Sequence, residues 1–362
     1  MKVERVLVVS TTNLGFNGIT SVIMNYYRNI DRKKIQFDFA IGEEIHESII
    51  SEIESLGGKI YILPSRKKKT ILFLRELKRI TIKNKYRIVH VHGNSGTMYF
   101  DIHALKKAGV PVRIAHSHNS TCNHKLIHKI LKNKLNKETT TAIACSKLAG
   151  EWLFNKDYTV LNNGIDIDRF LFNEEVRNNY RKKMNLEDKF VIGHIGHFSY
   201  QKNHEFLLNI FKEVHQRDKS SILILIGDGS LRGDIEKQIS DLNLNDSVIL
   251  LGKRQDAAEL MKAMDVFVFP SRFEGLPVVL VEAQAAGLNC IVSDAITKES
   301  QITGRLNYLS LDSKYDLWAD EILKYTEVYK RDDVKELIIN SNYNIKNETR
   351  KLEQIYFKDI KA

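Results

Sequence analysis

The sequence is poor in the residue types that mark several special classes of protein. Its 362 residues include three cysteines, at Cys122, Cys145 and Cys290, too few and too scattered for a disulfide framework or a zinc knuckle. Only 4 prolines and 19 glycines are present, which excludes a collagen-like chain and a Pro- and Gly-rich disordered chain. We therefore expect a folded globular protein from a reducing compartment.

Long apolar runs are absent as well. No stretch approaches the ~18 consecutive apolar residues that a transmembrane helix needs. The opening residues MKVERVLVVS carry charges at Lys2, Glu4 and Arg5 before a short apolar run, which indicates a β-strand and not a signal peptide. We expect a soluble, cytoplasmic protein, and its length indicates two domains of roughly 150–200 residues each.

The formal net charge of +10 is unevenly distributed along the chain. Residues 1–170 carry 28 Lys and Arg against 15 Asp and Glu, whereas residues 171–362 carry 27 against 30. Such asymmetry indicates that one half meets an anionic partner. Much of the excess lies in two segments, 66–87 and 125–137.

Segment 125–137, KLIHKILKNKLNK, places apolar residues at helical spacing between lysines. A basic amphipathic helix of this kind can lie on an anionic membrane surface. The simpler interpretation is a surface helix whose apolar face packs on its own domain, and the sequence leaves both open. Nucleic acid is disfavoured as a partner because no aromatic platform accompanies the charge. The lysines of this segment are Lys125, Lys129, Lys132, Lys134 and Lys137.

Short apolar runs alternate with longer amphipathic ones in two blocks, separated by a polar stretch at 171–189. Continuous apolar runs such as 222–227 suit strands that are buried on both faces of a parallel sheet. This alternation predicts two doubly wound α/β domains, with a ligand site in a cleft at the carboxyl ends of the strands. The expected strands are 5–10, 37–41, 59–63, 88–91, 112–116, 141–145, 190–195, 221–226, 247–250, 266–269 and 289–293. The expected helices are 18–29, 46–56, 70–84, 97–108, 123–137, 203–216, 230–241, 256–263, 279–287 and 345–360.

Segment 267–294, FVFPSRFEGLPVVLVEAQAAGLNCIVSD, carries the most chemical information. Pro277 suits the start of a helix because its missing N–H would be unpaired there. Glu274 then lies in a loop at a helix N-terminus, where backbone N–H groups converge. Glu282 interrupts the apolar run of the same helix, where a solvated side chain is unexpected. Two carboxylates in these places can hydrogen-bond the hydroxyls of a sugar and a ribose.

The pattern Pro-Ser-x-x-Glu-Gly-x-Pro at 270–277, followed by Glu282, resembles the signature of the family-4 retaining glycosyltransferases. Other segments resemble the same family in the expected order: VLNNGIDIDRF at 160–170, HIGHFSYQKNH at 194–204, IGDGSLR at 226–232 and VILLGKRQD at 248–256. The resemblance implies the GT-B fold, in which two Rossmann-like domains face each other across a cleft. It implies domains at 1–170 and 171–344, with a helix at 345–362 that returns to the first domain.

The resemblance also implies an activity. A hexose would pass with retention from a nucleotide-diphosphate sugar, by family frequency a UDP-sugar, to a saccharide or a lipid-linked saccharide. Neither a metal nor a further cofactor would be required. A basic first domain fits an acceptor at the inner face of the cell membrane, as in capsule or exopolysaccharide synthesis. A nucleotide-sugar epimerase of the same fold and a degenerate membrane adaptor are the alternatives.

Roles for individual residues follow from the same resemblance. Lys202 would hold the donor diphosphate, Glu274 the sugar hydroxyls and Glu282 the ribose. His118 would approach the transferred sugar, which makes His118, Glu274 and Lys202 the catalytic set. The implied donor-binding residues are Gly18, Gly196, His197, Lys202, Arg254, Glu274, Gly275, Leu276, Pro277 and Glu282. The implied acceptor-side residues are His92, Asn94 and Asn119.

Two features complicate this assignment. His197 occupies the place of a family arginine, and a mostly neutral imidazole is a weaker phosphate ligand than a guanidinium. Either Arg254 or Arg272 would compensate, or the activity would be weaker and depend more steeply on pH. Histidine pairs also occur at two strand ends, in IVHVHGNSG and IAHSHNS. A metal site is the obvious alternative there, but no Asp or Glu stands near either pair to orient the rings, so we expect none.

Overall fold

The computed structural model describes residues 3–15, 17–327, 329, 331 and 334–361, and the chain divides into two compact units. Unit 1 comprises residues 1–164 and 345–362, and unit 2 comprises residues 165–344. The predicted boundary after residue 170 is therefore placed too late in the chain. Residues 165–170 belong to unit 2 because Ile165 forms a β-bridge with Asn344 and the buried Phe170 closes a short helix packed against unit 2.

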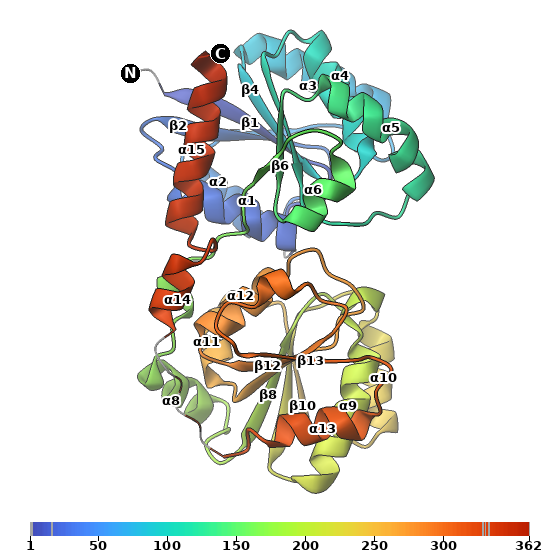
Figure 1. The fold of residues 1–362 in the computed structure, drawn as a ribbon, viewed down its shortest axis with the longest axis vertical. Coiled ribbons are helices and arrows are strands. Elements are labelled where there is room, and N and C mark those ends of the chain that lie inside the picture. Colours follow the sequence, from blue (N-terminus) through green and yellow to red (C-terminus); the bar gives the residue numbers. More distant parts are fainter. Residues whose placement is uncertain (1–2, 16, 328, 330, 332–333, 362) are drawn as a thin grey trace. The chain divides into compact units, whose positions relative to one another are not determined.

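Within its described residues, unit 1 contains a seven-stranded parallel sheet in the order β3-β2-β1-β4-β5-β6-β7 (Figure 1). Its strands are β1 (Glu4–Ser10), β2 (Ile35–Ile41), β3 (Ile60–Ile62), β4 (Ile88–Gly93), β5 (Val112–Ser117), β6 (Thr141–Ala144) and β7 (Thr159–Val160). The strand order reverses at β1, which pairs with both β2 and β4. In doubly wound sheets this reversal is where ligands bind, beyond the carboxyl ends of the strands.

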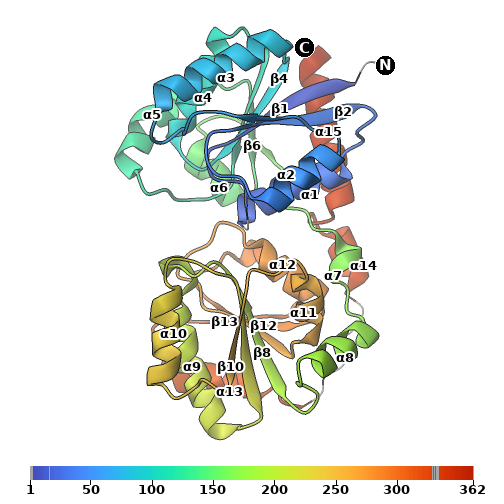
Figure 2. The ribbon, with the colours of Figure 1, turned by 180° about the vertical axis from the view of Figure 1, so that it is seen from behind.

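Helices cover both faces of this sheet. They are α1 (Gly18–Asn29), α2 (Glu47–Ser55), α3 (Thr70–Asn84), η1 (Gly96–Met98), α4 (Tyr99–Lys107), α5 (Lys125–Glu138), α6 (Lys147–Leu153) and α15 (Ile345–Lys361). Figures 1 and 2 show α3, α4 and α5 on one face, and α15 beside α1 on the other. The last helix of the chain is thus part of unit 1.

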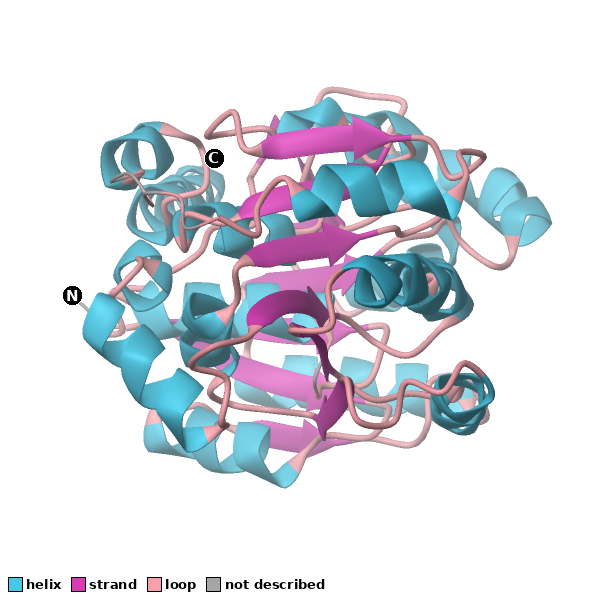
Figure 3. Cartoon of the chain, turned by 90° about the horizontal axis from the view of Figure 1, so that it is seen from below, coloured by secondary structure: helices cyan, strands magenta, loops and turns pink. Residues whose placement is uncertain are grey.

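Unit 2 repeats the architecture with a parallel sheet that, over the described residues, has six strands in the order β10-β9-β8-β11-β12-β13. The strands are β8 (Phe190–Ile195), β9 (Ser221–Ile226), β10 (Val248–Gly252), β11 (Val266–Phe269), β12 (Asn289–Ser293) and β13 (Leu306–Leu309). The helices are α7 (Ile167–Phe170), α8 (Glu174–Lys183), η2 (Tyr200–Lys202), α9 (His204–Arg217), α10 (Arg232–Asp241), α11 (Ala257–Ala263), α12 (Val278–Ala285), η3 (Lys298–Ser300), α13 (Tyr315–Leu323) and α14 (Lys335–Asn340). Figure 3 shows helices along both sides of the strands.

The predicted strands and helices are present, but the sequence missed several elements with weak patterns. These are β7, β13, α6, α7, α8, α13 and α14. The polar stretch at 171–189 contains α8, whose cap is Asn173. Two arginines of α8, Arg177 and Arg181, form ion pairs with Asp265 beside β11. A salt-bridged helix of this kind lacks the apolar stripe that reveals most helices. Among the described residues, no helix has both the length and the hydropathy to cross a bilayer.

Candidate active site

Close backbone contacts join the loops that follow β8, β9 and β10. The Gly196 N–H donates to the Ile226 carbonyl at 2.9 Å, and the Gly227 N–H donates to the Gly252 carbonyl at 2.9 Å. Gly227 has a φ of +143°, and a Cβ there would lie 1.9 Å from the Gly196 carbonyl oxygen. These contacts require glycine and bring the predicted phosphate-binding loop against its neighbour.

Gly227→Ala is expected to destabilise unit 2 by about 2–4 kcal/mol, because the added methyl group meets backbone and the residue must adopt a strained φ. The change in melting temperature on thermal unfolding measures this cost. Gly233→Ala is the matched control: a Cβ at this exposed position of α10 would meet no atom within 4 Å. There alanine should be neutral or slightly stabilising, and equal losses from both substitutions would contradict the account.

Lys202 ends η2 and forms an ion pair with Glu274, the residue that the sequence assigns to the sugar hydroxyls. Lys202 Nζ lies 2.7 Å from Glu274 Oε1 and 4.4 Å from the centroid of the Phe269 ring. Both partners are largely buried, with 16% and 9% of their side chains exposed. An ammonium has three N–H donors, so the bond to Glu274 leaves two N–H donors of Lys202 for a phosphate. The same bond fixes the position of the Lys202 ammonium.

Glu274 comes from the loop 270–277, which leads from β11 to α12. The Arg272 N–H donates to the Gln201 carbonyl at 2.8 Å, which ties this loop to η2. Gly275, Leu276 and Pro277 are buried and lead directly into α12, which begins at Val278 as Pro277 predicts. The structure therefore brings this loop and Lys202 together in unit 2.

Glu282 lies about one turn into α12 and is partly buried. No described residue hydrogen-bonds or ion-pairs its carboxylate. Burial raises the pKa of Glu282 to about 7, and the nearby positive charge of Arg169 partly offsets this shift. A carboxylate without a partner and with a pKa raised by desolvation is available to a ligand.

The three other candidate phosphate ligands differ in their surroundings. His197 is exposed, as is expected of a residue that meets a ligand. Arg254 donates twice to Asp256, at 2.7 and 2.6 Å, so its guanidinium is already engaged. Arg272 stacks on the Tyr200 ring at 4.3 Å, beside the turn that carries Lys202. Of the two arginines proposed to compensate for His197, Arg272 is the better placed.

Sequence reasoning missed two buried histidines that surround Lys202. His194 and His204 pack edge to face, with ring centroids 4.8 Å apart, and His204 follows Lys202 by two residues. Burial lowers the pKa of His194 to about 4 and that of His204 to about 2, so both are neutral beside the ammonium. Both histidines belong to the segment HIGHFSYQKNH at 194–204, which also contains Lys202, and this closeness in sequence could have indicated that they lie near it.

In unit 1, the glycine-rich loop 11–18 connects β1 to α1. Asn17 caps α1 by accepting from the Thr20 N–H at 3.0 Å, and helix α1 begins at Gly18. A Cβ added at Gly15 or Gly18 would meet no atom within 4 Å, so space is open in front of this backbone. Phe16, in the same loop, lies outside the described residues.

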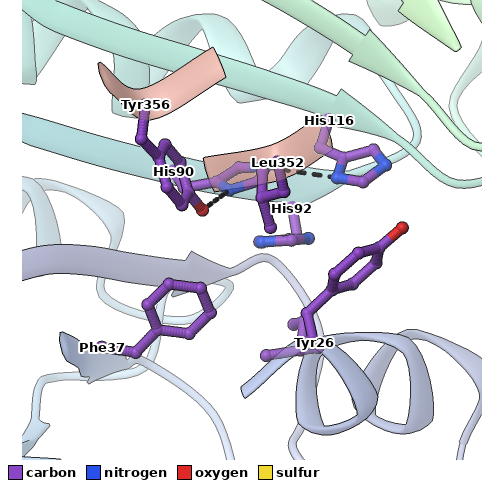
Figure 4. Close-up of a pocket in the computed structure, with 8 residues that line it drawn as sticks. Tyr26, Phe37, His90, His92, His116, Leu352 and Tyr356 are labelled. Atoms are coloured by element: carbon purple, nitrogen blue, oxygen red, sulfur yellow. Dashed lines mark hydrogen bonds between the residues drawn. The ribbon is translucent and has the colours of Figure 1, made fainter. Parts of the chain in front are cut away.

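The two histidine pairs meet on one face of the sheet, as strand alternation predicts. His92 Nδ1 lies 2.9 Å from His118 Nε2, and His90 Nε2 lies 3.2 Å from His116 Nδ1. Figure 4 shows His90, His92 and His116 lining a pocket with Tyr26, Phe37 and Tyr356.

The other acceptor-side candidates follow the same two strands. Asn94 lies just beyond β4, and its carbonyl accepts from Trp152 Nε1 at 2.8 Å. Asn119 lies just beyond His118, and its side-chain oxygen accepts from the Ser120 N–H at 2.7 Å. Both asparagines are partly exposed at the carboxyl ends of the strands.

Both halves of the chain match known protein families. Residues 16–169 match the model of glycosyltransferase family 4, and residues 176–337 match that of the glycosyl transferases group 1. A solved structure of HepE from Anabaena, in complex with UDP and glucose, superposes with a TM-score of 0.80 at 16% identity. It covers 97% of this chain and 98% of that one. Two Rossmann-like units and this likeness define the GT-B fold of glycosyltransferases.

The similarity to curated proteins extends along the whole chain. A putative glycosyltransferase from Bacillus subtilis, EpsF, is 34% identical over 98% of this chain and 96% of its own length. The chain belongs to the family-4 glycosyltransferases. The capsular polysaccharide glycosyltransferase CapH of Staphylococcus aureus is 27% identical over 84% of this chain and 85% of its own. A UDP-Gal:α-D-GlcNAc-diphosphoundecaprenol α-1,3-galactosyltransferase of Escherichia coli is 31% identical over 61% of each chain.

Proposed function

We propose that this glycosyltransferase moves a hexose from a UDP-sugar to a lipid-linked saccharide in the synthesis of a bacterial surface polysaccharide. The observation that carries the proposal is the buried pair of Lys202 and Glu274, in a member of this family whose helix α12 also carries an unpartnered Glu282. The activities for which two relatives are named support a capsular product and a lipid-diphosphate acceptor. The UDP complex of HepE and the galactosyltransferase's UDP-Gal support the nucleotide.

The transfer breaks the bond between the anomeric carbon and the diphosphate, so charge develops on both fragments. Lys202 stabilises the departing diphosphate, because a fixed ammonium in a partly dehydrated site interacts strongly with developing negative charge. Glu274 holds sugar hydroxyls, Glu282 holds the ribose, and His118 approaches the transferred sugar. The acceptor hydroxyl replaces the diphosphate with retention, and the diphosphate takes its proton. We propose that this step uses no metal.

The test is a transfer assay with a panel of UDP-sugars and a diphospholipid-linked saccharide in anionic vesicles, with and without a chelator. We expect one UDP-sugar to give a product whose anomeric configuration, assigned by NMR, matches that of the donor, at a rate unaffected by the chelator. An inverted product would contradict the retaining mechanism. Isomerised donor without transfer would support an epimerase instead.

The titration of Glu282 gives the reaction a pH dependence at the binding step. If ribose hydroxyls donate to the ionised carboxylate, donor binding requires loss of a proton whose pKa lies near 7. The dissociation constant of UDP-galactose should then be about tenfold larger near pH 6 than near pH 8, as measured by calorimetry. The UDP-sugar is preferable to UDP because its diphosphate diester does not titrate in this range.

Glu282→Gln is the matched control, since it keeps the size of the side chain and removes the titration. This variant should bind weakly at both pH values. An unchanged tenfold dependence in Glu282→Gln would assign the titrating group elsewhere.

We further propose that α5 holds the enzyme at the inner face of the cell membrane. Leu131 and Leu135 pack inward, whereas Leu126, Ile127 and Ile130 are 72%, 45% and 60% exposed. The sequence left open whether this apolar face packs on its own domain, and only part of it does. Exposed apolar residues among lysines favour an anionic lipid surface. The lysines are Lys125, Lys129, Lys132, Lys134 and Lys137.

Reversing the charge of Lys125 and Lys129 together is expected to weaken binding to phosphatidylglycerol vesicles at least tenfold, because each lysine near such a surface contributes about 1 kcal/mol. Co-sedimentation at low and high salt measures the effect. The matched control reverses the charges of Lys219 and Lys237, two exposed lysines of unit 2 that do not belong to α5. If both double variants lost vesicle binding equally, binding would depend only on the net charge of the protein. That result would contradict a role for α5.

A further inference from the structure

A cluster of four buried histidines lies where β4 and β5 meet α15. His90, His92, His116 and His118 are between 0% and 9% exposed. Neighbouring rings are stacked, with centroids 4.0 Å apart for His90 and His92 and 4.1 Å apart for His116 and His118. His118 is assigned to the transferred sugar and His92 to the acceptor side, whereas His90 and His116 have no role in the transfer reaction proposed above.

Three of these side chains place ligand nitrogens in one small volume. One nitrogen each from His90, His92 and His116 lies within 4.8 Å of the other two. His90 Nε2 and His116 Nδ1 lie 3.2 Å apart, within hydrogen-bond distance. Two nitrogens bound to one tetrahedral Zn²⁺ at about 2.0–2.1 Å are separated by roughly 3.3 Å, so these two are already at ligand spacing. One nitrogen of His92 completes the set of three.

Neighbouring groups orient two of the rings. The Tyr356 hydroxyl of α15 lies 2.7 Å from His90 Nδ1. His118 Nε2 lies 2.9 Å from His92 Nδ1, which leaves His92 Nε2 for a ligand. Histidines that bind metals usually hydrogen-bond through their other ring nitrogen in this way. The expectation of no metal rested on the lack of a neighbouring Asp or Glu, and Tyr356 and His118 supply that orientation instead.

The chemical state of the cluster also suits a metal. Burial lowers the pKa of His90 to about 3, and lowers the pKa values of His92 and His116 well below the usual range, so the rings are neutral. Neutral imidazoles bind Zn²⁺, Cu²⁺ and Ni²⁺, whereas Mg²⁺ requires oxygen ligands.

We propose that His90, His92 and His116 form a binding site for a divalent transition-metal ion of the zinc type, oriented by Tyr356 and His118. Ile23 is one of the apolar residues of the remaining pocket wall. Figure 4 shows two others, Phe37 and Leu352. Because Tyr356 belongs to α15, the ion links the last helix of the chain to the central strands of unit 1. The site shares His92 and its partner His118 with the residues assigned to the acceptor and the transferred sugar. It uses none of the donor-binding residues of unit 2 and does not rest on the proposed function.

The test uses full-length, tag-free protein that has been stripped with a chelator and carries no donor. Calorimetric titration with ZnCl₂ is expected to give one tight site per chain. Titration with Co²⁺ should give the visible d–d bands of a tetrahedral nitrogen-ligated ion. His116→Phe keeps a ring of similar size in the core, and is expected to weaken Zn²⁺ binding more than tenfold.

Two further variants keep the test decisive if His116→Phe is poorly folded. Tyr356→Phe retains the ring and removes only the hydroxyl that orients His90, and should weaken Zn²⁺ binding about 10–100-fold. His103→Ala removes a partly exposed histidine of the same unit, paired with Glu138, and should leave the tight site unchanged. The proposal is overturned if the wild type shows no tight site, or if folded Tyr356→Phe and His116→Phe bind Zn²⁺ as the wild type does.

Discussion

Lys202→Ala is expected to lower kcat/KM for sugar transfer by about 10²–10³-fold, the usual cost of removing one group that stabilises developing charge. The loss should appear in kcat as well as in KM, because the diphosphate gains charge as it departs. Steady-state kinetics with a saturating acceptor measures both parameters.

The control for Lys202→Ala is Lys219→Ala, which removes an exposed lysine of the same unit. It should leave kcat and KM unchanged. Lys202→Arg keeps the positive charge but changes the geometry, and should recover part of the lost activity. If Lys202→Ala retained more than about a tenth of wild-type kcat/KM, Lys202 would not be the diphosphate ligand.

Glu274→Gln should lower kcat/KM about 10²-fold, for two physical reasons. The substitution removes an acceptor for the sugar hydroxyls and also the anion that holds Lys202 Nζ at 2.7 Å. Removing one partner of a largely buried ion pair leaves the other charge uncompensated, which disturbs its position. Glu205→Gln, at an exposed site three residues after Lys202, is the matched control and should be silent.

The double variant separates these two contributions. If Glu274 acts partly through Lys202, Lys202→Ala with Glu274→Gln should lose less activity than the product of the single losses, because contacting residues couple. If the activity lost by the double variant equalled the product of the two single losses, each residue would act independently. The ion pair would then have no part in positioning Lys202.

The fold was largely predictable because parallel strands buried on both faces leave continuous apolar runs in the sequence. β8, β9, β11 and β12 begin and end at the predicted residues. The elements that were missed depend on partners distant in sequence. Helix α8 is held by ion pairs to Asp265, more than 80 residues away. Strand β13 forms by pairing with β12, and its own short sequence does not indicate this pairing.

In the candidate site, too, local motifs could be predicted from the sequence, whereas contacts between distant residues could not. The motif at 270–277 and the segment at 194–204 were each recognisable, yet neither pattern indicates that Lys202 and Glu274 pair across 72 residues. The hydrogen bond between His90 and Tyr356 spans 266 residues and was equally inaccessible. The pairing of Arg254 with Asp256 was local, and the two-residue spacing could have shown that this arginine is less available to phosphate.

The central claim, that unit 2 binds a nucleotide-diphosphate sugar through the residues named, is tested most directly by thermal unfolding with added nucleotides. Wild type and Glu282→Ala are melted with UDP, GDP, ADP and NAD in parallel. UDP at about 100 times its dissociation constant should stabilise the wild type by about 2.7 kcal/mol. Glu282→Ala should respond less, and NAD should have no effect on either protein. If no nucleotide shifts the melting temperature at millimolar concentration, or if Glu282→Ala responds as the wild type does, the donor site assigned here is wrong.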